Sequence, residues 1–159
     1  MISRRFASCK GIGALLVALV AACLATSALA QAGAVPLPTT RLTAGIHVIT
    51  AELATNDATR GRGLMFREQL APNHGMLFIF PRPSAQCMWM RNTPLPLSVA
   101  FISDGGAIVN IEDMQPHTEA SHCSKQPVRY ALEMAQGWFA RRGLKPGSKV
   151  TGLPAAAGR

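Results

Sequence analysis

The chain has 159 residues, which is the length of one domain. Hydrophobic residues make up 48% of it and charged residues 15%, a balance that excludes overall disorder. Its 14 glycines follow no period and its 11 prolines interrupt long helical runs, which excludes collagen and coiled coils. The 16 Lys and Arg against 8 Asp and Glu give a formal net charge of +8, but the bases form no long run, so we expect no nucleic-acid partner.

The first 30 residues have the order of a secretory signal peptide. Residues 1–10 contain three basic side chains and no acid, and residues 11–30 carry no charge. Residues 28–30 read Ala-Leu-Ala, and small residues at this spacing are typical of a cleavage site. The pattern predicts a signal peptide at 1–30 and export to the periplasm or the cell exterior. An uncleaved membrane anchor is the alternative.

A second processing site lies inside the same stretch. Residues 20–23 read Val-Ala-Ala-Cys, which resembles the box at which bacterial lipoproteins are cut and lipidated. Cys23 would then become the lipidated N-terminus and hold the protein on a membrane. The folded part is exported under both hypotheses, and the only membrane contact expected is through the signal peptide or this lipid.

The remaining chain reads as short elements separated by turn residues. Residues 31–40 are rich in Ala, Pro and Thr and predict a linker. The apolar run at 75–80 predicts a strand buried on both faces and stopped by Pro81 and Pro83. Short helices are expected at 56–62 and 136–142. The expected strands are 41–43, 46–54, 75–80, 87–91, 98–103, 107–114, 129–134 and 149–152.

These elements predict the fold class. Many short strands, few helices and a strong hairpin signal at 104–106 (Asp-Gly-Gly) are typical of all-β domains. We expect a mainly β protein with a single compact antiparallel β-sandwich or barrel-like domain and two short helices. The domain should run from 41 to 153, and the tail at 154–159 should fray.

The strand expected at 87–91 has a face that suits a ligand. Its alternation places Trp89 and Arg91 on one side, next to Asn92 where the strand ends. An aromatic plate, a planar cation and an amide suit a small polar or anionic ligand. The alternative is structural, with Trp89 in the core and Arg91 paired with an acid such as Glu112.

Glu133 is an acid within the apolar strand 129–134. A buried carboxylate needs a partner, and an arginine such as Arg67 or Arg91 is the structural answer. The functional alternative is an acid with a raised pKa in a cleft. With Trp89, Arg91 and Asn92, the residues Arg67 and Glu133 complete the candidate ligand site. No second carboxylate for hydrolysis is identifiable and no catalytic motif is present, so the residues favour a binding protein over an enzyme.

Sulfur and imidazole side chains offer an alternative function. Thioether, thiolate and imidazole ligands suit copper, although methionine is also a common core residue. Copper binding is therefore the alternative to the expectation that the protein needs no cofactor. Its candidate ligands are Cys87, Met88, Met90, His117, His122 and Cys123.

Two cysteines remain once residues 1–30 are removed. Cys87 and Cys123 would then lie in an oxidising compartment, where an even number of cysteines favours a disulfide. We predict that the two are bonded. Two unpaired thiols are the alternative.

Several words of the sequence resemble one protein family. In order, these are Arg-Gly-Leu-Met-Phe-Arg-Glu at 62–68, Gly-Met-Leu-Phe at 75–78, Trp-Met-Arg-Asn-Thr at 89–93, Arg-Tyr-Ala-Leu-Glu at 129–133 and Gly-Trp-Phe-Ala at 137–140. Together they resemble the DUF192 family of uncharacterised bacterial and archaeal proteins, from about residue 45 to residue 150. The resemblance implies a compact, mostly β fold that is commonly exported, and no established activity. We therefore expect an exported module that binds a small ligand or a cell-envelope component.

Overall fold

A computed structural model describes residues 36–155. The predicted signal peptide, Cys23 and residues 31–35 of the predicted linker lie outside the described residues, and the last two residues of that linker, 39–40, belong to β1. Residues 36–155 contain no helix long and apolar enough to cross a membrane. The elements are β1 (Thr39–Ala44), β2 (His47–Ala54), α2 (Asp57–Arg62), β3 (His74–Ser84), β4 (Cys87–Met88), β5 (Leu97–Ile102), β6 (Ile108–Met114), β7 (His122–Cys123), β8 (Val128–Ala135), the 3₁₀ turn η1 (Ala140–Arg142) and β9 (Val150–Thr151).

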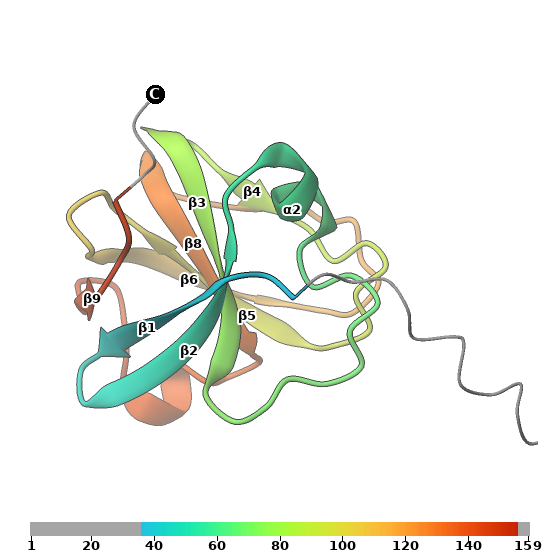
Figure 1. Cartoon of the computed structure of the whole chain (residues 1–159), viewed down its shortest axis with the longest axis horizontal. Coiled ribbons are helices and arrows are strands. Elements are labelled where there is room, and N and C mark those ends of the chain that lie inside the picture. The colour runs from blue at the N-terminus through green and yellow to red at the C-terminus, as the bar shows by residue number, and fades with distance from the viewer. Residues whose placement is uncertain (1–35, 156–159) are drawn as a thin grey trace, which may run out of the picture. The chain divides into compact units, whose positions relative to one another are not determined.

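Seven of the strands form one sheet, in the order β6-β5-β8-β3-β2-β1-β9, and β4 pairs with β7 in a small second sheet (Figure 1). The mainly β prediction is confirmed. The strand pairs are antiparallel, as expected, except β2–β3, which is parallel. Parallel neighbours need a crossover, and here α2 and the loop after it carry the chain back to the start of β3.

The large sheet curls until its two ends meet. Ala107 forms an isolated bridge with Lys149, and the Ile108 amide donates to the Ser148 carbonyl over 2.9 Å. These contacts join the start of β6 to the segment before β9 and close the sheet as a barrel. Gly106 is needed at the seam, because its φ is 83° and a Cβ there would lie 2.6 Å from the Val150 carbonyl oxygen.

Both faces of the central strands are buried. One cluster fills the inside of the barrel and includes Tyr130, Leu132 and Met134 of β8. The opposite face is covered by a second, helix-side cluster, which the sequence did not predict as a separate core. Its buried members are Ala54, Leu64, Met76, Phe78, Phe80, Met88, Met90, Leu97, Val99, Phe101, Met114, Val128 and Ala131.

Most predicted elements are present with shifted ends. The hairpin β1–β2 and the helix α2 are confirmed, and Asn56 caps α2 by accepting from the Thr59 amide over 2.9 Å. The expected helix at 136–142 is a turn that ends in η1, and Gly143 ends it with φ 65°. The loop expected after 116 contains the short strand β7.

Two predicted strand limits are wrong. β3 continues past Pro81 and Pro83 to Ser84, because its pairing with β8 is irregular there and the prolines owe no ladder hydrogen bond. The strand expected at 87–91 is reduced to β4. Its alternation is nevertheless correct, since Met88 and Met90 are buried whereas Cys87, Trp89 and Arg91 are exposed.

Candidate ligand-binding pocket

A pocket of about 380 Å³ lies between α2, β3, β4 and β8. Figure 1 shows α2 beside β3 and β4. The volume of this pocket falls within the range of small-molecule sites. The lining residues are Asp57, Arg60, Gly61, Arg62, Gly63, Leu64, Met65, Phe78, Phe80, Gln86, Cys87, Met88, Trp89, Thr93 and Glu133.

Arg60 fixes α2 against the barrel. Its side chain is only 14% exposed. The Nη1 group donates to the carbonyls of Thr55 and Ile79 over 2.7 and 2.8 Å, and Nη2 pairs with Asp57 over 2.6 Å. The guanidinium also lies 5.8 Å from the centre of the Phe80 ring. Arg60 is thus already paired, and its positive charge is balanced by Asp57.

Gly63 ends α2 and turns the chain along the pocket. Its φ of 47° and ψ of −135° suit glycine, and a Cβ would come 3.3 Å from the Phe78 ring. No sequence pattern assigns this turn to the candidate site. Gly61 differs, because a Cβ there would meet nothing within 4 Å.

Two turns from distant parts of the chain are joined next to the pocket. The Phe66 amide donates to the Asn92 carbonyl over 2.8 Å, and the Thr93 amide donates to the Met90 carbonyl over 3.0 Å. Asn92 adopts a φ of 55°, a conformation that asparagine tolerates better than most residues. The turn places Thr93 in the pocket wall and leaves Trp89 46% exposed at the pocket.

Glu133 contributes the one carboxyl that is both buried and part of the pocket lining. It is 3% exposed and lies in β8 between its cross-strand partners Met76 on β3 and Val99 on β5. None of the four ion pairs formed within residues 36–155 includes it. Burial among apolar side chains raises the pKa of Glu133 to about 8. At neutral pH the group is therefore mostly a carboxylic acid, with one O–H donor and free acceptor capacity.

The arginines expected to pair with Glu133 pair elsewhere. Arg67 Nη2 lies 2.7 Å from Glu52 Oε2, and Arg91 Nε lies 3.8 Å from Glu119 Oε1. The structural explanation of Glu133 is therefore wrong, and a carboxylic acid facing a pocket takes its place. The expected pair of Arg91 with Glu112 is also wrong.

The predicted ligand residues divide into two groups. Trp89 and Glu133 line the pocket, whereas Arg67, Arg91 and Asn92 do not. The Arg91 guanidinium lies 5.8 Å from the centre of the Trp89 ring and supports that side chain from outside. Since Trp89 is nearly half exposed, the hypothesis of a core tryptophan is wrong.

Arg60, Arg62 and Thr93 are lining residues that the sequence analysis did not single out. Nothing in the local sequence placed them near Glu133. The segment 56–62 has Asp57 near its start and Arg60 and Arg62 near its end. This order of charges indicated only a helix with favourable ends.

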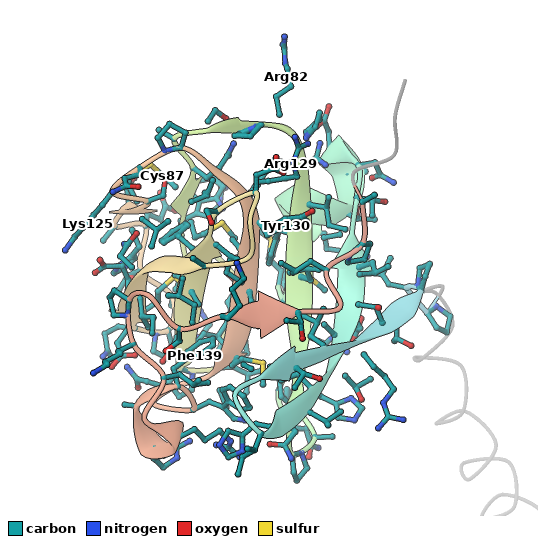
Figure 2. The ribbon with its side chains drawn as sticks, turned by 90° about the vertical axis from the view of Figure 1, so that its left-hand side faces the viewer. Arg82, Cys87, Lys125, Arg129, Tyr130 and Phe139 are labelled. Carbon is teal, nitrogen blue, oxygen red and sulfur yellow. A yellow bond between two sulfur atoms is a disulfide. The ribbon has the colours of Figure 1, made fainter. Side chains whose placement is uncertain are left out.

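The predicted disulfide is present. Cys87 and Cys123 are bonded, with Cα atoms 4.0 Å apart, and they face each other across β4 and β7. Cys87 lines the pocket, so the bridge holds one of its walls. Figure 2 shows Cys87 and Lys125 at the same edge of the molecule, and the Ser124 amide donates to the Gln86 carbonyl over 2.8 Å.

The structure brings the candidate copper ligands together only in part, since Met88 and His122 are cross-strand partners in the β4–β7 sheet. In the disulfide neither sulfur is a thiolate, and Met88 and Met90 belong to the helix-side cluster. Within residues 36–155, no three His, Cys, Asp or Glu side chains are close enough to hold a metal ion. Copper binding through Met88, Met90, His117 and His122 stays an untested hypothesis.

Comparison with known proteins identifies the family. The model of DUF192, described as uncharacterized ACR, matches residues 39–152. The chain belongs to the DUF192 family. Among proteins with curated descriptions, none matches it.

Two solved structures show the same fold. One comes from Sinorhizobium meliloti and bears the provisional description of a transcription regulator. It is 41% identical, with a TM-score of 0.72 over 76% of this chain and 98% of that one. The other, a protein of unknown function from Novosphingobium aromaticivorans, is 34% identical, with a TM-score of 0.70 over 75% of this chain and 94% of that one.

Four of the five words that carry the DUF192 resemblance meet at the pocket. The word at 62–68 supplies its helix exit, the word at 75–78 supplies Phe78, and the word at 89–93 supplies Trp89 and Thr93. The word at 129–133 supplies Glu133. Four segments spread over 72 residues of sequence thus converge on one cavity.

Proposed function

We propose that this DUF192 protein is an exported binding protein that holds a small ligand in the pocket beside α2. The observation that carries the proposal is the Glu133 carboxyl, which is buried, lines the pocket and has no ion-pair partner among the described residues. A buried polar group without a partner destabilises a protein unless a ligand or water completes its hydrogen bonds. Retaining such a group is a feature of functional sites.

The surroundings of Glu133 favour binding over catalysis. Asp57 is the other acid of the lining, but its carboxylate is exposed and paired with Arg60. No histidine lines the pocket in the described part of the chain. An acid without a second reacting group fits recognition better than catalysis, because a binding site needs only a few polar groups that orient the ligand.

Filling the pocket tests the proposal. Gly61→Leu places a side chain into open space at the pocket lining, and Ala58→Leu adds the same side chain to an exposed position of α2 that does not line it. The measurement is a small-fragment screen by two-dimensional NMR on the chain from residue 31 onward. Fragments should shift the signals of Trp89 and Glu133 in the wild type and in Ala58→Leu, and should fail to do so in Gly61→Leu. Equal binding by all three proteins, or no binding fragment at all, would reject the pocket.

Export is the second part of the proposal, and it is supported by the pattern of residues 1–30. The test is the intact mass of the protein recovered from the cell envelope after expression of the full chain. A mass that begins at Gln31 indicates cleavage after Ala30, and a mass that begins at a diacylated or triacylated Cys23 indicates a lipoprotein. Recovery of the full-length chain in the cytoplasm would contradict export.

A further inference from the structure

The charges around the pocket do not cancel. Asp57 and Arg60 neutralise each other over 2.6 Å, which leaves Arg62 as the charged group and Glu133 as an uncharged acid among the ionisable lining residues. Arg62 lies in the last turn of α2, is exposed, and takes part in none of the ion pairs among residues 36–155. Its guanidinium therefore has its full charge available to a ligand.

The other charged side chains near Glu133 are already paired. On β2, Glu52 is the cross-strand partner of Met76, which in turn is the partner of Glu133, and Glu52 is held by Arg67. Beside Trp89, Arg91 is paired with Glu119. The partners of Glu133 on its two neighbouring strands are the apolar Met76 and Val99. Burial alone raises the pKa of Glu133, with no contribution from Arg62 or another cation, so the buried group remains a donor.

Part of the pocket lining is apolar. Phe78 and Phe80 of β3, Leu64 and Met65 after α2, and Met88 of β4 line the cavity. Such walls accept a hydrocarbon or aromatic body and contribute affinity by removing it from water. A ligand that fits all three parts has an apolar body, an oxygen acceptor and a negative charge.

We propose that the pocket selects small carboxylic acids with an apolar body, with the Glu133 hydroxyl donating a hydrogen bond to a ligand oxygen and Arg62 attracting the ligand's negative charge. This inference rests on the proposed function and adds the ligand class. A protonated carboxyl is a good partner for an anion because it donates without adding a like charge. An ammonium ligand would instead need Glu133 to lose its proton and would meet the uncompensated charge of Arg62.

The two ligand classes predict opposite responses to pH. A ligand with an acceptor oxygen binds the protonated form of Glu133. The affinity of such a ligand is constant below the pKa of Glu133 and falls above it by about tenfold per pH unit. An amine binds the ionised form, so its affinity rises over the range in which Glu133 loses its proton.

The test uses three probes of one shape, which are 3-phenylpropionate, 3-phenylpropanamide and phenethylamine. The chain has two tryptophans, and the Trp138 indole N–H is held by Asn73 over 3.0 Å, so the Trp89 indole signal reports on the pocket. We expect 3-phenylpropionate to bind at least tenfold more tightly than phenethylamine at pH 6.5 and to lose affinity between pH 8 and 9.5. Tighter binding of the amine, or a carboxylate affinity that does not change with pH, overturns the inference.

Variants test the contributions of Glu133 and Arg62 separately. Glu133→Gln is permanently neutral and keeps a donor, so it should retain the carboxylate probe and lose the pH dependence. Glu133→Leu should lose the probe. Arg62→Gln should weaken the carboxylate probe roughly 3–10-fold at low salt, as expected for one exposed charge, and leave the amide probe unchanged.

Arg82→Gln is the matched control for Arg62→Gln. Arg82 points away from the ribbon in Figure 2 and does not line the pocket, so its loss should leave every affinity unchanged. An equal effect of the two arginine variants would show that net charge alone attracts the anion. If the fragment screen finds pocket ligands but none of the three probes binds, the ligand class is wrong and the proposed function stands.

Discussion

Arg67 and Glu52 form an ion pair, with 2.7 Å between Nη2 and Oε2, and this pair leaves Glu133 without a cation. Both acids project on the same face of the sheet, since Glu52 opposes Met76 and Met76 opposes Glu133. One acid, Glu52, lies on β2, where Arg67 from the loop after α2 reaches it. The other lies at the centre of the sheet and is covered by the helix-side cluster.

The stability of the protein should therefore fall as the pH rises from about 5 to 8. Burial raises the pKa of Glu133 from 4.5 to about 8 in the folded state, so between these values the folded protein holds a proton that the unfolded chain has lost. Ionisation then opposes folding, with a slope of up to about 1.4 kcal/mol per pH unit from this group. Urea unfolding at pH 5, 6.5 and 8 measures the effect.

Glu133→Gln is the control for this measurement. The amide cannot ionise, so the variant should lose this part of the slope and should be more stable than the wild type at pH 8. Parallel curves for the two proteins would show that Glu133 does not carry the effect.

The glycines on either side of Arg62 should respond in opposite directions to the same substitution. Gly63→Ala should destabilise the protein by about 1–3 kcal/mol, because alanine is strained at φ 47° and its Cβ meets Phe78. Gly61→Ala should stabilise it by about 1 kcal/mol, since the position is helical and its surroundings are open. Chemical unfolding of both variants checks the pair. Destabilisation by Gly61→Ala would mean that the helix end is packed differently.

Arg60→Ala should destabilise the protein by about 2 kcal/mol, because the Ile79 carbonyl and the Asp57 carboxylate both lose a donor. Arg62→Ala is the matched control in the same helix and should change stability by less than about 0.5 kcal/mol. Equal losses in the two variants would contradict the anchoring role of Arg60. Thermal unfolding followed by circular dichroism gives both values.

Reduction of the Cys87–Cys123 bridge should destabilise the domain and lower the affinity of the pocket for fragments. The cysteines are 36 residues apart, and closing a loop of this length stabilises the folded state by roughly 4 kcal/mol in the chain-entropy model. Since Cys87 lines the pocket, fragment affinity should fall as well. Urea unfolding with and without dithiothreitol measures the first effect, and the fragment screen measures the second.

The double variant Cys87→Ser, Cys123→Ser is the control for reduction. It should match the reduced wild type and show no response to dithiothreitol. The oxidised wild type should also be two hydrogens lighter than its reduced form by intact mass. A wild type whose two thiols react with a maleimide before reduction would contradict the disulfide.

The sequence by itself determined the local structure of this protein. Asp-Gly-Gly at 104–106 and Ala-Gly at 44–45 specify hairpins through turn geometry, and Asn56 specifies the start of α2 through its cap. Membership of the family, the disulfide and the alternation of Met88 and Met90 with exposed neighbours were also predictable. Each depends on residues close in sequence, or on a chemistry that leaves few alternatives.

Only the tertiary structure decided what Glu133 faces. Its neighbours come from β3, β5 and the segment after α2, and which arginine reaches which acid depends on strand order and on the parallel β2–β3 crossover. The sequence offered Arg67 and Arg91 as partners because both are long and basic, but strand order places Arg67 beside Glu52. The pocket arises from the same cause, since side chains from four separate segments border it, and no local pattern encodes how those segments pack.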